Sequence, residues 1–242
     1  TSVSARNGKM YFEFQLVNAL PKLAWDAAIH RGQPRVRLLH GPSVELRENA
    51  FFEGAWDGRF EDFAFDSALS CMGSGGRLEN GRAVFVAPSH KLEWIQSVAT
   101  AGALYISNSL AFLLVLAGEE LDCNYPNYFF DYLRYFREGL TAQNRPIRLR
   151  SGNNAYLHIC CNIAVDPALN VVAIPKPVPS PFTDYLDYAD FLETTARRLA
   201  QNAVHPRRAI LYPPVAAISR GYDSVAVAAL AARDGEIGRA HV

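Results

Sequence analysis

Six consecutive residues near the C-terminal end, Ser-Arg-Gly-Tyr-Asp-Ser at positions 219–224, combine side chains that could do chemistry. An apolar run at residues 215–218 precedes them, and an alanine-rich stretch at residues 225–233 follows. The apolar run predicts a strand, and the turn with glycine and hydroxyl residues predicts a loop. The alanine-rich stretch predicts a helix, because alanine is a good helix former. Backbone N–H groups and the helix N-terminus then face the space above the loop, which favours an anion there.

The residue types in this loop fit a polyphosphate with its metal ion. Ser219 and Ser224 add hydroxyl donors, and Gly221 lets the backbone approach a phosphate closely. Asp223 cannot bind phosphate itself, but its carboxylate can hold the Mg²⁺ that accompanies a polyphosphate. The alternative is a plain strand–turn–helix connection, in which the Ser and Asp side chains only cap the helix.

The same six residues resemble the SGGxDS pyrophosphate loop (PP-loop) of the N-type ATP pyrophosphatases, in the branch of the asparagine synthetases and β-lactam synthetases. Ser219, Gly221, Asp223 and Ser224 match the family pattern, whereas Arg220 stands where the family has its first glycine. A side chain there either crowds the phosphate or adds a guanidinium contact to it. The resemblance implies ATP and Mg²⁺ as cofactors, with Asp223 as the metal ligand.

The resemblance also implies a reaction, ATP-dependent formation of an amide. A substrate carboxylate would attack the α-phosphorus of ATP to give an acyl-adenylate and pyrophosphate, and an amine or ammonia would then displace AMP. Donors and Mg²⁺ placed at the leaving pyrophosphate would stabilise the charge that develops in the transition state. The implied partners are a small carboxylate and an amine or ammonia donor. The alternative is a non-catalytic binding or assembly module derived from the same family, with Arg220 marking a lost nucleotide site.

Composition excludes several other classes of function. Of the 242 residues 50% are hydrophobic, and 24 Lys and Arg balance 24 Asp and Glu. A nucleic-acid or anionic-membrane binder would carry a basic excess, so neither partner is expected. The apolar residues 101–116 are too short and too interrupted to cross a membrane. With no secretory leader pattern, we expect a cytoplasmic protein.

The cysteines and histidines do not form a pattern typical of a metal site. Cys71, Cys123, Cys160 and Cys161 lack C-x-x-C spacing, and we expect free thiols in a reducing compartment. None of the six histidines makes an i, i+4 pair or combines with the cysteines. The only metal ligand that the sequence predicts is therefore Asp223.

The first part of the chain is rich in predicted strands and turns. Strands are expected at residues 10–17, 36–39, 83–87, 103–106, 147–149, 154–161 and 171–174. Hairpin turns are expected at residues 54–59, 74–77 and 80–81, and a short helix at residues 21–30. One helix is expected to be capped by Ser107 or Asn108 and to end at Gly118. A second helix is expected at residues 127–137. The order of these elements resembles the N-terminal-nucleophile (Ntn) glutaminase domain of the amidotransferase-type synthetases.

A stretch with regularly spaced prolines separates the two predicted domains, because such a stretch favours polyproline II over a sheet or helix. We expect an α+β, β-rich Ntn-amidotransferase-like domain over residues 1–175, a linker over 176–182, and the first part of an α/β, adenine nucleotide α-hydrolase-like PP-loop domain over 183–235. A long helix from Thr183 or Asp184 to about residue 204 opens the second domain. Residues 236–242 match the translation of a common sequencing adapter and are predicted to be a non-native tail.

An active glutaminase domain of this kind begins with a cysteine whose own amine is the general base. This chain begins with Thr1, and the glycine-rich turns that the family places near its nucleophile are absent after it. The first domain is therefore expected to be vestigial or clipped, and the chain inactive by itself. Apolar helix faces left without partners would favour self-association, so a homo-oligomer is among the expected partners.

Overall fold

The structure is a computed structural model that describes residues 9–137, 144–216, 221–233 and 238–239. It is a mixed α+β fold, rich in sheet, and the chain divides into two compact units. The first unit comprises residues up to Glu53 together with Gly73–Lys176, and the second comprises Gly54–Met72 together with the residues from Pro177 onward. No described helix is long and apolar enough to cross a membrane.

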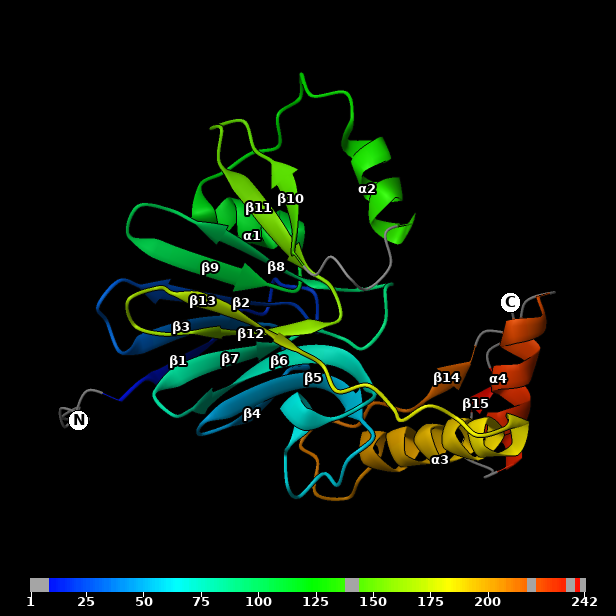
Figure 1. Cartoon of the computed structure of the whole chain (residues 1–242). Coiled ribbons are helices and arrows are strands. Elements are labelled where there is room, and N and C mark those ends of the chain that lie inside the picture. The colour runs from blue at the N-terminus through cyan, green and yellow to red at the C-terminus, as the bar shows by residue number, and fades with distance from the viewer. Residues whose placement is uncertain (1–8, 138–143, 217–220, 234–237, 240–242) are drawn as a thin grey trace. The chain divides into compact units, whose positions relative to one another are not determined.

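The first unit is built on two sheets (Figure 1). One sheet has seven strands in the order β1-β3-β2-β9-β8-β11-β10, and the other has six in the order β13-β12-β7-β6-β5-β4. The strands of the first sheet are β1 (Tyr11–Leu16), β3 (Arg35–His40), β2 (Trp25–His30), β9 (Ala103–Ser107), β8 (Ile95–Ala99), β11 (Asn154–His158) and β10 (Asn144–Arg148). Those of the second are β13 (Val171–Pro175), β12 (Cys161–Val165), β7 (Arg82–Val86), β6 (Cys71–Glu79), β5 (Ala50–Trp56) and β4 (Glu45–Arg47).

The two sheets pack face to face through one apolar core. Trp25 and Ile29 from β2 share this core with Phe51 from β5, Phe85 from β7 and Ile163 from β12, and all five are fully buried. Every second residue of a strand faces the same way, so each strand contributes alternate side chains to the core. The Trp25 and Phe51 rings meet edge to face, with centroids 4.9 Å apart.

Helix α1 (Leu110–Ala117) covers the other face of the seven-stranded sheet. Its Leu113 and Leu114 pack against Val98, Leu149 and Ala155. The Ser109 side chain caps its N-terminus by accepting a hydrogen bond from the Phe112 N–H, and Gly118 ends it in the left-handed conformation. Gly118 is confirmed as the residue that ends the helix, but the predicted cap is wrong. The side chains of Ser107 and Asn108 bond instead to the backbone of Trp25, so Ser109 takes the capping position. Helix α2 (Tyr128–Arg137) follows, within one residue of its predicted bounds.

Two local predictions in this unit are wrong for reasons of packing. Residues 21–30 hold strand β2 and no helix, because Trp25, Ala27 and Ile29 alternate into the core between the sheets. Residues 74–77 lie inside strand β6 and make no hairpin turn. Gly75 and Gly76 are needed there because an added Cβ would approach the Phe51 carbonyl oxygen to 2.2 Å or the Phe51 ring to 2.8 Å. The predicted Asn80-Gly81 hairpin is confirmed between β6 and β7, with both residues at positive φ.

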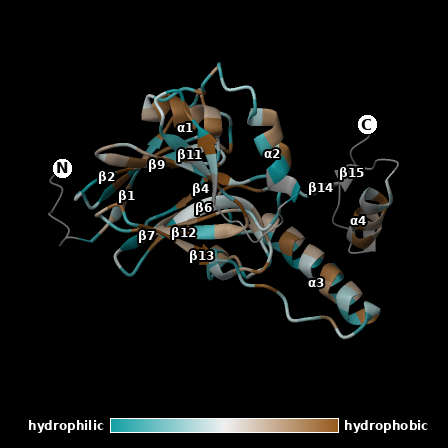
Figure 2. Ribbon diagram, turned by 45° about the horizontal axis from the view of Figure 1, so that its top comes forward, coloured by the Kyte–Doolittle hydropathy of each residue, from teal (hydrophilic) through white to brown (hydrophobic). Residues whose placement is uncertain are grey.

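The second unit contains helix α3 (Tyr185–Ala203), strand β14 (Val215–Ala216), helix α4 (Tyr222–Arg233) and strand β15 (Gly238–Arg239). Asp184 caps α3 by accepting from the Asp187 N–H at 2.9 Å, as predicted. Figure 2 shows hydrophobic and hydrophilic residues in turn along α3, and of its residues only Asn202 and Ala203 are buried. Strands β14 and β15 pair in parallel, and β15 falls within the predicted non-native tail.

The segment between β5 and β6 belongs to this second unit, where the sequence predicted a hairpin of the first domain. Trp56, Phe60, Phe63 and Phe65 from this segment pack ring against ring, with neighbouring centroids 5.2–6.0 Å apart. The short 3₁₀ helix η1 (Phe65–Ser67) lies within the same segment. Residues 54–59 therefore begin an aromatic cluster instead of turning back as a hairpin.

Asn202 and Arg208 connect this aromatic cluster to the C-terminal end of α3 through hydrogen bonds and cation–π contacts. The Arg208 guanidinium lies 4.7 Å from the Phe60 ring centroid and 5.3 Å from that of Trp56. It also donates to the backbone and side-chain oxygens of Asn202. Asn202 Nδ2 in turn donates to the Gly58 carbonyl at 2.9 Å. Both side chains are buried, so their hydrogen bonds form away from competing water.

We expect Arg208→Ala to destabilise the second unit by about 3 kcal/mol, because it removes cation–π contacts and the guanidinium hydrogen bonds to both buried oxygens of Asn202. Arg208→Lys should recover only part of this loss, since an ammonium lacks the planar fork of donors. Amide hydrogen exchange of residues 54–72 reports on this unit directly. The matched control is Arg198→Ala, at an exposed position on α3. Equal exchange rates in the two alanine variants would contradict the prediction.

Candidate functional site

The predicted phosphate loop lies between strand β14, which ends at Ala216, and helix α4, which begins at Tyr222. Ser219 and Arg220 fall outside the described residues, and so does the side chain of Asp223. Among the described loop residues, the Ser224 hydroxyl donates to the Gly221 carbonyl at 3.1 Å. This bond joins the residue before α4 to the first turn of the helix. The roles of Ser219, Arg220, Gly221, Asp223 and Ser224 in binding phosphate, and of Asp223 in binding metal, stay predictions.

Metal ligation elsewhere finds no support in the part of the chain that the structure describes. Within those residues no group of three or more His, Cys, Asp or Glu side chains could hold a metal ion. All four cysteines are free thiols, as predicted.

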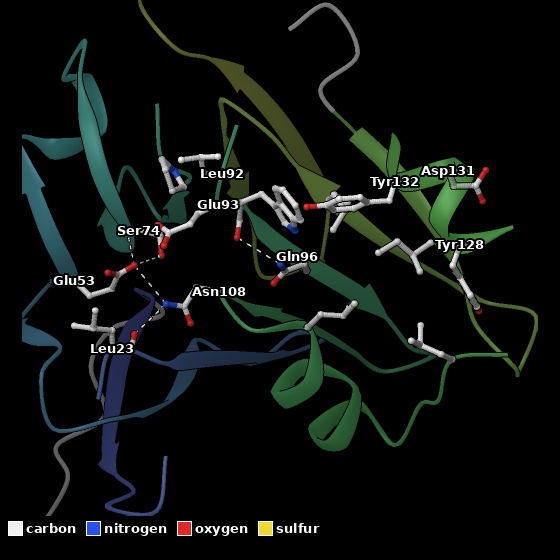
Figure 3. Close-up of a pocket in the computed structure, with 16 residues that line it drawn as sticks. Leu23, Glu53, Ser74, Leu92, Glu93, Gln96, Asn108, Tyr128, Asp131 and Tyr132 are labelled. Carbon is white, nitrogen blue, oxygen red and sulfur yellow. Dashed lines mark hydrogen bonds between the residues drawn. The ribbon is translucent and has the colours of Figure 1, made fainter. Parts of the chain in front are cut away.

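A cavity of about 450 Å³ lies in the first unit, where sequence reasoning placed no site. Its volume is within the roughly 300–1,000 Å³ typical of small-molecule sites. Strands β5, β6, β8 and β11, helix α2, and the residues that lead into α1 all contribute to its walls. Figure 3 shows Glu53, Ser74 and Asn108 together at one end, with Tyr128 and Asp131 of α2 at the other.

Glu53 is the most deeply placed acid of this cavity, with 7% of its surface exposed. Its Oε1 accepts from the Ser74 N–H at 2.8 Å, from the Ser74 hydroxyl at 2.7 Å and from Asn108 Nδ2 at 3.4 Å. All three bonds fall on the same oxygen, so the described residues make no hydrogen bond to Oε2. Asn108 is itself held by the Leu23 carbonyl, which accepts from Nδ2 at 2.9 Å.

A glycine makes this arrangement possible. Gly73 has a φ of +115°, and an added Cβ would lie 1.8 Å from the Glu53 carbonyl oxygen. Only glycine adopts such a conformation without strain, and only glycine lets β6 come so close to β5 here. The result is that both the N–H and the hydroxyl of the next residue, Ser74, reach the Glu53 carboxyl group.

Burial raises the pKa of Glu53 from 4.5 to about 8, and the negative charge of Glu93 adds to the rise. The hydrogen bonds from Ser74 and Asn108 act in the opposite direction but do not compensate for the lost hydration. Glu53 is therefore mostly protonated at neutral pH. A carboxyl group whose pKa lies near working pH, inside a cavity, is typical of functional sites.

The other walls of the cavity are aromatic and aliphatic. The rings of Trp94 and Tyr132 meet edge to face with centroids 5.7 Å apart. The Gln96 side chain holds the Trp94 indole in place. Its amide oxygen accepts from Trp94 Nε1 and its amide nitrogen donates to the Ser107 carbonyl, each at 2.8 Å. Leu92 is 80% exposed, so this part of the lining lies at the cavity mouth.

Sequence reasoning missed this site because its signals are ambiguous in the chain. The sequence predicts Asn108 only as a possible helix cap and residues 127–137 only as a helix, whereas Asn108, Tyr128 and Tyr132 all line the cavity. Glu53 stands in an apolar strand, Ala-Phe-Phe-Glu-Gly-Ala-Trp. A single acid in such a strand is the one feature of the sequence that indicates this site.

No protein-family model matches this chain, and no curated protein matches it. The likeness of residues 219–224 to a pyrophosphate loop therefore rests on the sequence motif and its flanking elements.

Proposed function

We propose that this chain takes part in ATP-dependent amide formation of the asparagine synthetase type, with residues 219–224 as the pyrophosphate loop. The observation that carries the proposal is the sequence motif of Ser219, Gly221, Asp223 and Ser224, which follows the apolar strand β14 and overlaps the first turn of helix α4. A helix N-terminus directly after such a loop presents free backbone N–H groups and a positive dipole end to an anion. The two-sheet first unit, which precedes the long capped helix α3, is compatible with an Ntn-type domain.

In the proposed mechanism the loop acts on the leaving group. Ser219, Gly221 and Ser224 bind the pyrophosphate oxygens through hydroxyl and backbone donors. Mg²⁺, held by Asp223, would neutralise charge as the bond between the α- and β-phosphates breaks. The Arg220 guanidinium adds a further cation beside the phosphates.

The test is calorimetric titration of ATP with and without Mg²⁺ into the protein and into its Asp223→Ala variant. We expect saturable, Mg²⁺-dependent binding that falls at least tenfold in the variant, because a carboxylate beside phosphates requires a cation between them. Thermal unfolding is measured in parallel, since loss of a helix cap alone costs about 0.5–2 kcal/mol.

Asp190→Ala, at an exposed position on α3, is the matched control and should bind as the unchanged protein does. If Asp223→Ala lowers the melting temperature but leaves binding of ATP and Mg²⁺ unchanged, Asp223 is only a helix cap and the proposal loses its metal ligand. If the unchanged protein shows no saturable binding, the non-catalytic module is the better description.

A further inference from the structure

We propose that the cavity of the first unit binds an organic cation: an amine or guanidinium compound with an apolar body and no carboxylate or phosphate group. The proposal concerns a different site from the phosphate loop and does not depend on the proposed function. It rests on the charge of the cavity, its depth and its aromatic walls.

The charged side chains of the cavity are all acids. Glu53, Glu93 and Asp131 line it, and among its described lining residues there is no lysine, arginine or histidine. His90 Nε2 approaches the Glu93 carboxylate to 3.9 Å, but burial lowers the pKa of His90, so at neutral pH it adds little positive charge. The cavity therefore attracts cations and repels carboxylates and phosphates.

The deep end of the cavity holds a carboxyl oxygen that could accept a hydrogen bond from a cation. Glu53 Oε1 is occupied by its bonds from Ser74 and Asn108, while Oε2 receives none from the described residues. An ammonium or guanidinium N–H reaching Oε2 would form a charge-assisted bond in a site shielded from water. The negative charge of Glu93 lies close enough to Glu53 to raise its pKa, and a cation would relieve that repulsion.

The walls suit the apolar body of such a ligand. Trp94 and Tyr132 offer ring faces and edges near the mouth, and a cation passing an aromatic face is attracted by its quadrupole. Leu110, Ile147 and Leu157 supply aliphatic surface around the interior. An aromatic or branched amine of modest size matches this combination of one acidic end and apolar sides.

Binding should release a proton, because Glu53 is mostly protonated without ligand and ionised beside a cation. Affinity is then expected to rise with pH up to about pH 8, where Glu53 is half ionised. Besides Glu53, the groups around the cavity that carry or can change charge are Glu93, Asp131 and His90, with the phenols of Tyr128 and Tyr132. The proton released near pH 7 is that of Glu53, because burial raises the pKa of this carboxyl group to about 8.

The experiment compares three probes that share a phenylethyl body: phenethylamine, its neutral counterpart 2-phenylethanol, and the zwitterion phenylalanine. Each is titrated by calorimetry at pH 6, pH 7 and pH 8, in buffers that differ in ionisation enthalpy. We expect phenethylamine to bind at least tenfold more tightly than either other probe, more tightly at pH 8 than at pH 6, and with release of a proton at pH 7.

Glu53→Gln should lower the affinity for phenethylamine at least tenfold and abolish its pH dependence. The variant keeps an Oε1 acceptor for Ser74, so the fold is retained. Glu79→Gln, at an exposed end of β6, is the matched control and should behave as the unchanged protein. Equal affinity for the amine and the alcohol, equal affinity for the zwitterion, or an unaffected Glu53→Gln variant would each overturn the proposal.

Discussion

Glu53→Gln is expected to stabilise the protein against unfolding at pH 9, while changing its stability little at pH 4. The carboxylate of Glu53 is buried, and burial raises its pKa from 4.5 to about 8. Gln is neutral at every pH and keeps an oxygen that accepts the Ser74 hydrogen bonds. At about 1.4 kcal/mol per pKa unit, the gain at high pH is at most about 5 kcal/mol.

The direction follows from which state releases its proton first. As pH rises through 4.5 the unfolded chain loses the Glu53 proton, whereas the folded chain keeps it until about pH 8. The folded state therefore binds more protons between these values, and stability falls as pH rises through this window. Above pH 8 both states are ionised, and the loss is complete.

Chemical denaturation of both proteins at pH 4, 6.5 and 9 measures this difference, with Glu79→Gln as the exposed control. The comparison between variants is needed because buried Asp26 also has a raised pKa and contributes to the same trend in both. A difference between Glu53→Gln and the unchanged protein that does not grow with pH would show that Glu53 is ionised in the folded state.

Gly75→Ala is expected to cost about 3–5 kcal/mol, a large part of the roughly 5–15 kcal/mol by which an ordinary domain is stable. The added Cβ would lie 2.2 Å from the Phe51 carbonyl oxygen and 2.8 Å from the Phe52 Cα. Both are backbone atoms of the neighbouring strand β5, so they cannot move aside as a flexible side chain could. The strand pair would have to separate, and the core around Phe51 would open with it.

Gly102→Ala is the control, because its added Cβ would meet nothing within 4 Å. Its stability should stay within about 0.5 kcal/mol of the unchanged protein. Soluble expression and urea denaturation separate the two variants. A Gly75→Ala protein as stable as Gly102→Ala would mean that β5 and β6 are less closely packed than described.

The sequence by itself determined those features that depend on neighbouring residues. Gly118 ends α1, Asp184 begins α3, and Asn80-Gly81 turns β6 into β7, each as predicted. Caps and tight turns are set by the hydrogen bonds and φ angles of a few adjacent residues, so local patterns suffice to find them. A strand and a helix also lie on either side of Ser219 and Arg220, although helix α4 begins at Tyr222, inside the predicted loop.

Tertiary structure decided whatever depended on contacts between distant residues. The helix expected at residues 21–30 is a strand because the two-residue alternation of Trp25 and Ile29 meets a facing sheet, and that burial outweighs local propensity. The glycines at 75 and 76 indicate a turn in the sequence, whereas in the structure Phe51 packs against them. The sequence does not show this contact.

The cavity belongs to the same class of feature. Glu53 meets Ser74 across 21 residues of chain and Asn108 across 55 residues, and Gly73 permits the first of these contacts. Its raised pKa comes from burial, which is a property of the packed sheets and of no local pattern. The sequence supplied the acid, and only the approach of β5, β6 and the residues before α1 removed it from water and placed it in a cavity.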